Sequence, residues 1–118
     1  MSEEDLRKFR KELVSGIAAL VLLNLLAKAD GERYGYEISK ELSDKAGDEP
    51  LFKQSALYPV LRQLESTGLL SSRVQVSLSG PPRRYYAITQ RGRQVLDLWT
   101  DTWGKMRDFV DQSLAGKE

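Results

Sequence analysis

The stretch 53–89, KQSALYPVLRQLESTGLLSSRVQVSLSGPPRRYYAIT, is the basis of the fold that we predict for this chain. Its first part repeats apolar residues at i, i+3, i+4 and i+7, the spacing of one buried face of an amphipathic helix over 53–67. The apolar residues with this spacing are Leu57, Val60, Leu61 and Leu64. Gly68 follows, at a position where helices commonly end in the left-handed conformation. Residues 70–88 are then expected to form a two-stranded hairpin, with its tip at 79–82. Val74, Val76 and Leu78 alternate with polar residues, which predicts a half-buried strand over 73–78.

The order of these elements is that of a winged helix, in which one helix enters a groove of DNA and a hairpin lies beside it. We call the hairpin 70–88 the wing. A further helix is expected after the wing. The expected fold class is therefore mainly α with a two-stranded β-hairpin (α+β): a winged helix-turn-helix domain followed by a long C-terminal helix.

The positive charge of the chain is concentrated around the same stretch. The net charge is only +1, yet residues 53–93 contain seven basic side chains and a single acid, Glu65. A basic segment inside an otherwise acidic chain is typical of a nucleic-acid-binding face. Chance clustering on a solvated hairpin is the structural alternative. The basic residues are Lys53, Arg62, Arg73, Arg83, Arg84, Arg91 and Arg93.

The predicted helix 53–67 has a second face that is suited to DNA. This face carries Ser55, Tyr58, Pro59 and Arg62. Pro59 is tolerated because it falls within the first two turns, where it removes only one or two backbone bonds. Gln54 and Arg62 are the expected base readers, since glutamine suits adenine and arginine suits guanine.

In the wing, Arg83 and Arg84 are neighbours in a strand, so they point to opposite sides. We expect one to reach a phosphate and the other to flank it or to enter the minor groove. Phosphate contacts position a protein and base contacts specify sequence, so these arginines should contribute affinity rather than discrimination.

Composition narrows the class of protein. A chain of 118 residues, 41% hydrophobic and 30% charged, is expected to form one soluble domain. It has no cysteine and no histidine, which removes disulfides, thiolate metal sites and the commonest general base. We therefore expect no enzyme activity, no metal and no cofactor. The uncharged stretch 13–27 is too short to span a membrane and no signal-peptide pattern is present, which favours a cytoplasmic protein.

The segments that precede residue 53 are expected to build the rest of the domain. Residues 17–29 are apolar nearly all round, which predicts the central core helix. Residues 34–46 predict a second helix with Ile38 and Leu42 inward, its N-terminus favouring a phosphate. Residues 47–50 are expected to be a loop, and 51–52 to anchor the next helix in the core.

The C-terminal segment predicts a self-association surface. Thr89 is a good N-cap for a helix over 90–113, and apolar residues recur along it at steps of 3, 4, 3 and 4. These residues are Leu96, Trp99, Trp103, Met106 and Val110. A small domain has too little inner surface to cover this stripe, so a second copy of the chain is the expected partner. The two tryptophans leave two interpretations open: a closed dimer core, or an aromatic-lined gap that admits a flat apolar ligand.

Three motifs in order resemble the PadR family of bacterial transcriptional regulators. They are GYEI at 35–38, LYPVLRQLESTGLL at 57–70 and GPPRRYYAIT at 80–89. The resemblance covers roughly residues 16–110 and is to the short form of the family, with a single C-terminal dimerisation helix. It implies a repressor that responds to a ligand, with Tyr36 on the DNA backbone and Trp103 at a stacking position. Packing of tyrosines is the alternative for Tyr36.

The resemblance also implies that the N-terminal segment, which carries Leu6, Phe9 and Leu13, packs on the partner's C-terminal helix. That segment either continues into the core helix or is separated from it by a kink at 15–16. Two departures from the family pattern stand out. Lys53 occupies a position where a small capping residue is usual, and Ala56 replaces the threonine that the family favours, so it offers no hydroxyl to DNA.

The predicted organisation is an N-terminal amphipathic helix at 1–15, the DNA-binding domain at 16–89, the dimerisation helix at 90–113 and a frayed tail at 114–118. The predicted function is a homodimeric repressor that binds double-stranded DNA and responds to a small aromatic effector. The predicted DNA contacts are Tyr36, Lys53, Gln54, Ser55, Tyr58, Pro59, Arg62, Arg73, Arg83 and Arg84. Two alternatives remain: a small-molecule-binding dimer, and a winged helix used only for protein interactions, which the local positive charge disfavours.

Overall fold

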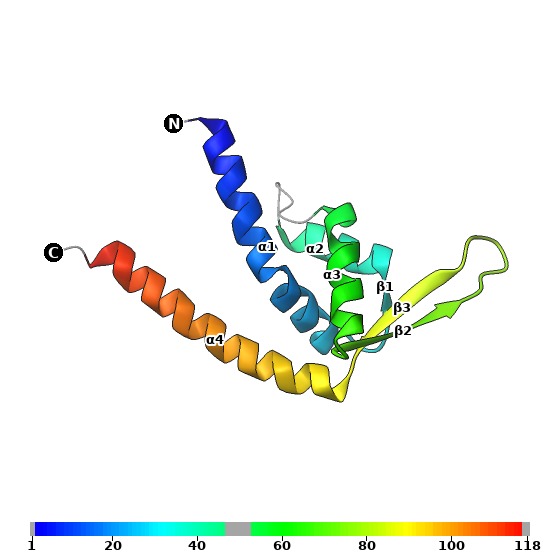
Figure 1. Cartoon of the computed structure of the whole chain (residues 1–118). Coiled ribbons are helices and arrows are strands. Elements are labelled where there is room, and N and C mark those ends of the chain that lie inside the picture. The colour runs from blue at the N-terminus through cyan, green and yellow to red at the C-terminus, as the bar shows by residue number, and fades with distance from the viewer. Residues whose placement is uncertain (1, 47–52, 117–118) are drawn as a thin grey trace.

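The computed structural model describes residues 2–46 and 53–116 and arranges them as a winged helix (Figure 1). The elements in chain order are α1 (Glu3–Lys28), β1 (Arg33–Tyr34), α2 (Gly35–Ala46), α3 (Gln54–Ser66), β2 (Leu70–Gln75), β3 (Arg83–Ile88) and α4 (Gln90–Ala115). The predicted fold class is confirmed. The wing projects from one end of the body, and α4 leaves the body in the other direction (Figure 1).

Helix α1 is a single helix that runs without interruption across Ser15 and Gly16. Of the two arrangements left open by the sequence, the continuous helix is the one observed. The helix begins at an N-cap, where the Ser2 side chain accepts a hydrogen bond from the Asp5 backbone N–H. Its second half enters the core, whereas the side chains of the first half are largely exposed.

The core lies where α1, α2, α3, the base of the wing and the start of α4 meet. The predicted inward residues Ile38 and Leu42 of α2 are buried in it. So are three of the four apolar residues predicted for α3, while Val60 is half-buried at its edge. The other buried members are Leu22, Leu23, Leu25, Leu26, Leu69, Leu70, Tyr86 and Leu96. This core fixes α3 against the wing.

The sheet has three antiparallel strands in the order β1-β3-β2. Strand β1, which pairs Arg33 with Tyr86 and Tyr34 with Tyr85, was not predicted. A two-residue strand shows no alternation for a sequence pattern to reveal. Its effect is to hold the start of α2 against the wing, so that α2, α3 and the wing converge.

One prediction about the wing is wrong. Alternation over 73–78 indicated a half-buried strand, but β2 ends at Gln75. The side chains of Val74, Val76 and Leu78 are 51%, 78% and 105% exposed. Apolar and polar residues do alternate in this segment. The strand is nevertheless not half-buried, because the outer wing extends past the body and no helix of the described chain covers its apolar side (Figure 1).

The turns that flank the wing are built as predicted. Gly68 has φ 85°, the left-handed conformation that ends α3. Thr89 caps α4, accepting a hydrogen bond from the Gly92 backbone N–H at 2.9 Å. Helix α4 ends at Ala115, two residues beyond the predicted end.

The loop predicted at 47–50 and the anchor predicted at 51–52 lie outside the described residues. Within the described part of the chain, no helix combines the length and hydropathy that a membrane-spanning segment requires.

Candidate nucleic-acid interface

A groove of about 800 Å³ opens between the N-terminus of α2, the outer face of α3 and the wing. Its walls combine aromatic rings with positive charge. The lining residues are Tyr34, Gly35, Tyr36, Tyr58, Arg62, Glu65, Ser66, Pro82, Arg83, Arg84 and Tyr86. Aromatic, arginine and hydroxyl groups are those that proteins use to contact phosphate, sugar and base edges.

Five predicted DNA contacts meet in this groove although the sequence places them in three separate segments. They are Tyr36, Tyr58, Arg62, Arg83 and Arg84. The others lie elsewhere. Lys53, Ser55 and Pro59 are exposed nearer the start of α3, beyond the groove lining. The Gln54 side chain is outside the described residues, and Arg73 does not line the groove but pairs with Glu32.

Tyr58 is positioned by the absence of a side chain at Gly35. A Cβ atom on Gly35 would lie 2.6 Å from Tyr58 Cε1 and 2.9 Å from its hydroxyl oxygen. Glycine as the first residue of α2 therefore leaves the space that the ring of Tyr58 on α3 occupies. The GYEI motif contains this glycine, but no local pattern indicates that its partner is Tyr58.

Arg84 belongs to a hydrogen-bonded chain that joins the wing to α3. Its Nη1 donates to Ser72 Oγ at 2.9 Å, and Ser72 Oγ donates to Glu65 Oε2 at 2.6 Å. In the sequence, Glu65 is noticeable only as the single acid among seven bases. The structure gives it a function: its carboxylate holds Ser72 and faces the groove.

Arg83 occupies the opposite face of the same strand, as predicted from the alternation. Its guanidinium carbon lies 4.6 Å from the centre of the Tyr34 ring, a cation–π contact. The Tyr34 ring also lies 6.4 Å from Tyr36 and 5.4 Å from Tyr85, measured between centroids. Tyr34 was not among the predicted contacts, yet it connects the wing arginine to Tyr36 at the start of α2.

Arg73 is engaged by a carboxylate rather than directed into the groove. Its Nε and Nη2 donate to the Glu32 carboxylate at 2.7–3.0 Å, a bidentate pair across 41 residues of sequence. This hydrogen bonding lowers the pKa of Glu32 and raises the pKa of Arg73, in both cases more than partial burial opposes it. Burial raises the pKa of Tyr86, which is part of the groove lining, although the charge of Arg84 acts in the opposite direction.

Two further arginines counted in the basic segment bind backbone carbonyls of the body. Arg91 Nε donates to Thr67 O at 3.2 Å, beyond the end of α3, and Arg93 Nη1 donates to Ala27 O at 3.4 Å, near the end of α1. Such hydrogen bonds satisfy carbonyls that helix ends leave unpaired. The positive charge that lines the groove is therefore carried by Arg62, Arg83 and Arg84.

A second hollow lies between α1 and α4, where the predicted self-association stripe begins. It has a volume of about 280 Å³ and is lined by Gly16, Ile17, Ala19, Leu20, Trp99, Thr102 and Trp103. The stripe divides here. Leu96 is buried in the core and Trp99 packs against it, whereas Trp103, Met106 and Val110 are exposed.

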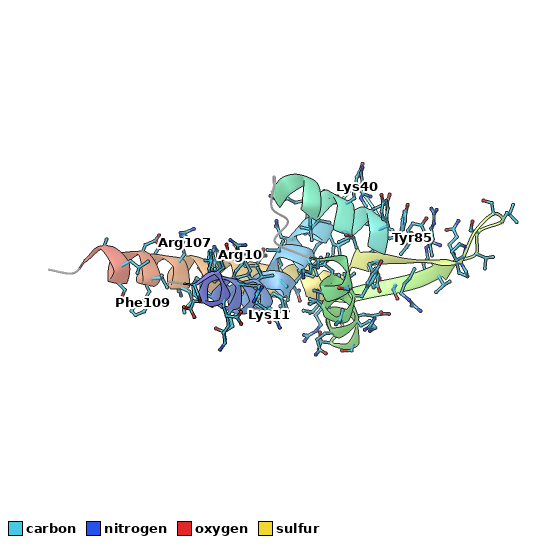
Figure 2. The ribbon with its side chains drawn as sticks, turned by 90° about the horizontal axis from the view of Figure 1, so that it is seen from above. Arg10, Lys11, Lys40, Tyr85, Arg107 and Phe109 are labelled. Atoms are coloured by element: carbon cyan, nitrogen blue, oxygen red, sulfur yellow. The ribbon has the colours of Figure 1, made fainter. Side chains whose placement is uncertain are left out.

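Exposed apolar side chains continue from this hollow to the free ends of both helices. Those on α1 are Leu6, Phe9 and Leu13, and those on α4 include Trp103, Met106, Phe109, Val110 and Leu114. Both ends project from the same side of the body (Figure 1). Figure 2 shows Phe109 extending from α4 on the side opposite Arg107.

The fold and the groove together define a winged helix-turn-helix protein. The model of the transcriptional regulator PadR-like family matches residues 22–98, so the chain belongs to this family. Its members are transcriptional regulators rather than enzymes.

Individual relatives agree with this assignment. A PadR family transcriptional regulator from Eggerthella lenta DSM 2243 has a similar structure, with a TM-score of 0.83 at 31% identity, covering 98% of this chain and 96% of that one. The negative transcriptional regulator PadR of Bacillus subtilis is 31% identical over 78 residues, 66% of this chain and 42% of its own length. The structure of Bacillus subtilis PadR in complex with operator DNA matches with a TM-score of 0.63 at 28% identity, covering 71% of this chain and 46% of that one.

Proposed function

We propose that this chain is a homodimeric DNA-binding repressor that places α3 in the major groove and the wing along the adjacent backbone. The observation that carries the proposal is the groove, which gathers four tyrosines and three arginines from β1, α2, α3 and the wing. The Bacillus subtilis relative is a negative regulator and forms a complex with operator DNA, which supports the same role here.

The contacts divide by chemistry. Arg62, which follows Gln54 by roughly two turns of α3, would read base edges together with it, since arginine suits guanine and glutamine suits adenine. Lys53, Ser55 and Pro59 extend the exposed face of α3 beyond the groove. Arg83 and Arg84 would hold phosphates on either side of the wing strand, which contributes affinity with little sequence discrimination.

The dimer would form through the outer halves of α1 and α4. Large apolar side chains are exposed along both of these segments, and a soluble monomer rarely leaves so much apolar surface in water. A second copy of the chain fits best because a two-fold interface buries the same surface on both subunits. Two-fold symmetry predicts operator half-sites about one DNA turn, roughly 34 Å, apart or a multiple of it.

An effector would bind at the hollow between α1 and α4. In one subunit this hollow has Trp99 and Trp103 on one wall and residues of α1, among them Gly16 and Ala19, on the other. Apolar, aromatic-lined hollows of this kind suit flat aromatic molecules. A ligand that prefers one spacing of the two subunits would shift the population toward or away from the DNA-binding form.

The test is a fluorescence-anisotropy titration against the DNA immediately upstream of the gene for this protein, at two salt concentrations. We expect saturable binding that a scrambled duplex does not compete and that weakens steeply with salt. Binding equal to that of random DNA at both salts would overturn the repressor proposal. Failure to bind any duplex at either salt would favour the alternative of a protein-interaction module. Quenching of tryptophan fluorescence by aromatic ligands, without DNA binding, would favour the small-molecule-binding dimer.

A further inference from the structure

The wing is joined to the segment that follows α1 by the ion pair between Arg73 and Glu32, and neither of these two residues lines the groove. After α1 ends at Lys28, a turn with Gly31 at φ 109° brings Glu32 beside strand β2. There the Glu32 carboxylate accepts three hydrogen bonds from Arg73, on strand β2 of the wing. Bidentate pairing of this kind fixes orientation as well as distance.

From Arg73 the contacts continue across the sheet toward the groove. Its guanidinium carbon lies 5.2 Å from the centre of the Tyr85 ring, on the strand partner that faces it. Tyr85 contacts Tyr34 on strand β1, and Tyr34 carries Arg83 over its ring. Figure 2 shows Tyr85 on the side of the wing where α2 lies. The contacts between Arg73, Tyr85, Tyr34 and Arg83 are therefore made on this side.

Only one end of this chain of contacts reaches the groove. Among the described residues, Tyr34 and Arg83 line the groove, whereas Glu32, Arg73 and Tyr85 do not. We infer that Glu32 and Arg73 are positioning residues, which set the orientation of the wing and thereby aim Arg83 at DNA. The inference rests on the proposed function, and it replaces the predicted role of Arg73 as a DNA contact.

Electrostatics and positioning make opposite predictions for Glu32. Removing a carboxylate near DNA reduces repulsion, so charge alone predicts that Glu32→Gln binds DNA more tightly. A positioning role predicts weaker binding, because the wing is then no longer oriented by its ion pair with the body. Asp30→Asn is the matched control, since Asp30 is an acid in the same turn, two residues earlier.

The wild-type protein is first used to select, from a random pool, the DNA duplex that it enriches most. The Kd of each variant for this duplex is then measured over a series of salt concentrations. The variants are Glu32→Gln, Arg73→Gln, Asp30→Asn and the charge swap that combines Glu32→Arg with Arg73→Glu. Hydrogen exchange of the wing amides, measured without DNA, reports wing order independently, and thermal unfolding checks that each variant folds.

We expect Glu32→Gln and Arg73→Gln to raise Kd about two- to fivefold, with the same salt slope in both variants and faster exchange in the wing. Asp30→Asn should bind as well as wild type or better, and the charge swap should recover most of the affinity. The inference is overturned if Glu32→Gln behaves like Asp30→Asn or if wing exchange does not change.

A decrease of about 0.9 in the salt slope for Arg73→Gln that Glu32→Gln does not share would also overturn it, because it would show that Arg73 binds a phosphate directly. If the wild-type protein enriches no duplex, the proposed function fails first and the inference falls with it. A reduced wing order in Glu32→Gln would then show that the ion pair stabilises the wing without serving DNA.

Discussion

Tyr58 of α3 lies so close to Gly35 of α2 that a methyl group on Gly35 would come within 2.6 Å of the tyrosine ring. The two helices therefore share one packing point directly beside the groove. The group in the way is a side chain that can rotate, so a larger residue at position 35 would displace the ring rather than prevent folding.

We predict that Gly35→Ala leaves stability nearly unchanged while weakening DNA binding. Replacing glycine with alanine lowers the conformational entropy of the unfolded chain, worth about 0.4–1 kcal/mol, which offsets the local crowding. Displacing the Tyr58 ring should cost about 1 kcal/mol of binding, roughly a fivefold increase in Kd. In a Tyr58→Ala background the same change should have no further effect on Kd. An equal increase in Kd in both backgrounds would show that Gly35 acts independently of Tyr58.

The salt dependence of DNA binding should separate the arginines that face DNA from those that hold the body together. Replacing Arg83 or Arg84 with glutamine should reduce the slope of log K against log salt by about 0.9 for each phosphate that is no longer neutralised. Arg91→Gln should leave the slope unchanged and lower stability by less than about 1 kcal/mol, because Arg91 binds the Thr67 carbonyl. A smaller slope for Arg91→Gln would place that residue on DNA.

The Glu32–Arg73 pair should contribute to stability in a pH-dependent way. Hydrogen bonding to Arg73 lowers the pKa of Glu32 below its ordinary value of 4.5. The stabilisation is therefore complete above that value and is lost as pH falls through the lower pKa of the folded state. Urea unfolding should show a constant difference between wild type and Glu32→Gln near neutral pH, shrinking in acid. A difference that persists unchanged in strong acid would contradict the ionic origin of the pair.

The N-cap of α4 should contribute measurably to the free energy of unfolding, because Thr89 also joins the end of the wing to Gly68 at its start. Thr89 Oγ1 accepts from the Gly92 backbone N–H and lies 2.7 Å from the Gly68 carbonyl oxygen, to which it can donate. Thr89→Ala should lower the free energy of unfolding by about 1–2 kcal/mol, and Thr89→Ser should retain most of it. The comparison is made by chemical denaturation. Equal decreases for both variants would point to the threonine methyl rather than the hydroxyl.

Sequence patterns predicted the helices well because each buries a periodic apolar face, as Leu57, Leu61 and Leu64 do in α3. Gly68 and Thr89 were also readable, since left-handed glycines and capping hydroxyls act locally. The pairing of distant residues was not readable. Counting charge could not show that Arg73 meets Glu32, or that Arg91 binds a helix end, because those partners lie 41 and 24 residues away. Nor could alternation show that the apolar side of the outer wing lacks a covering layer.

Replacing Trp103 tests whether the hollow between α1 and α4 is an effector site distinct from the DNA-binding face. It is 41% exposed and lines the hollow, on a helix that leaves the body away from the wing (Figure 1). Trp103→Ala should reduce the binding of a planar aromatic probe, such as anilinonaphthalene sulfonate, by about tenfold, which corresponds to roughly 1.4 kcal/mol.

Operator affinity should change much less in the same variant, provided that light scattering shows the dimer intact. Leu98→Ala is the matched control, because Leu98 is an exposed apolar residue of α4 that does not line the hollow. It should leave probe binding unchanged. Equal decreases in probe and operator binding in Trp103→Ala would mean that the tryptophan serves the dimer as a whole, and the separate effector site would have to be abandoned.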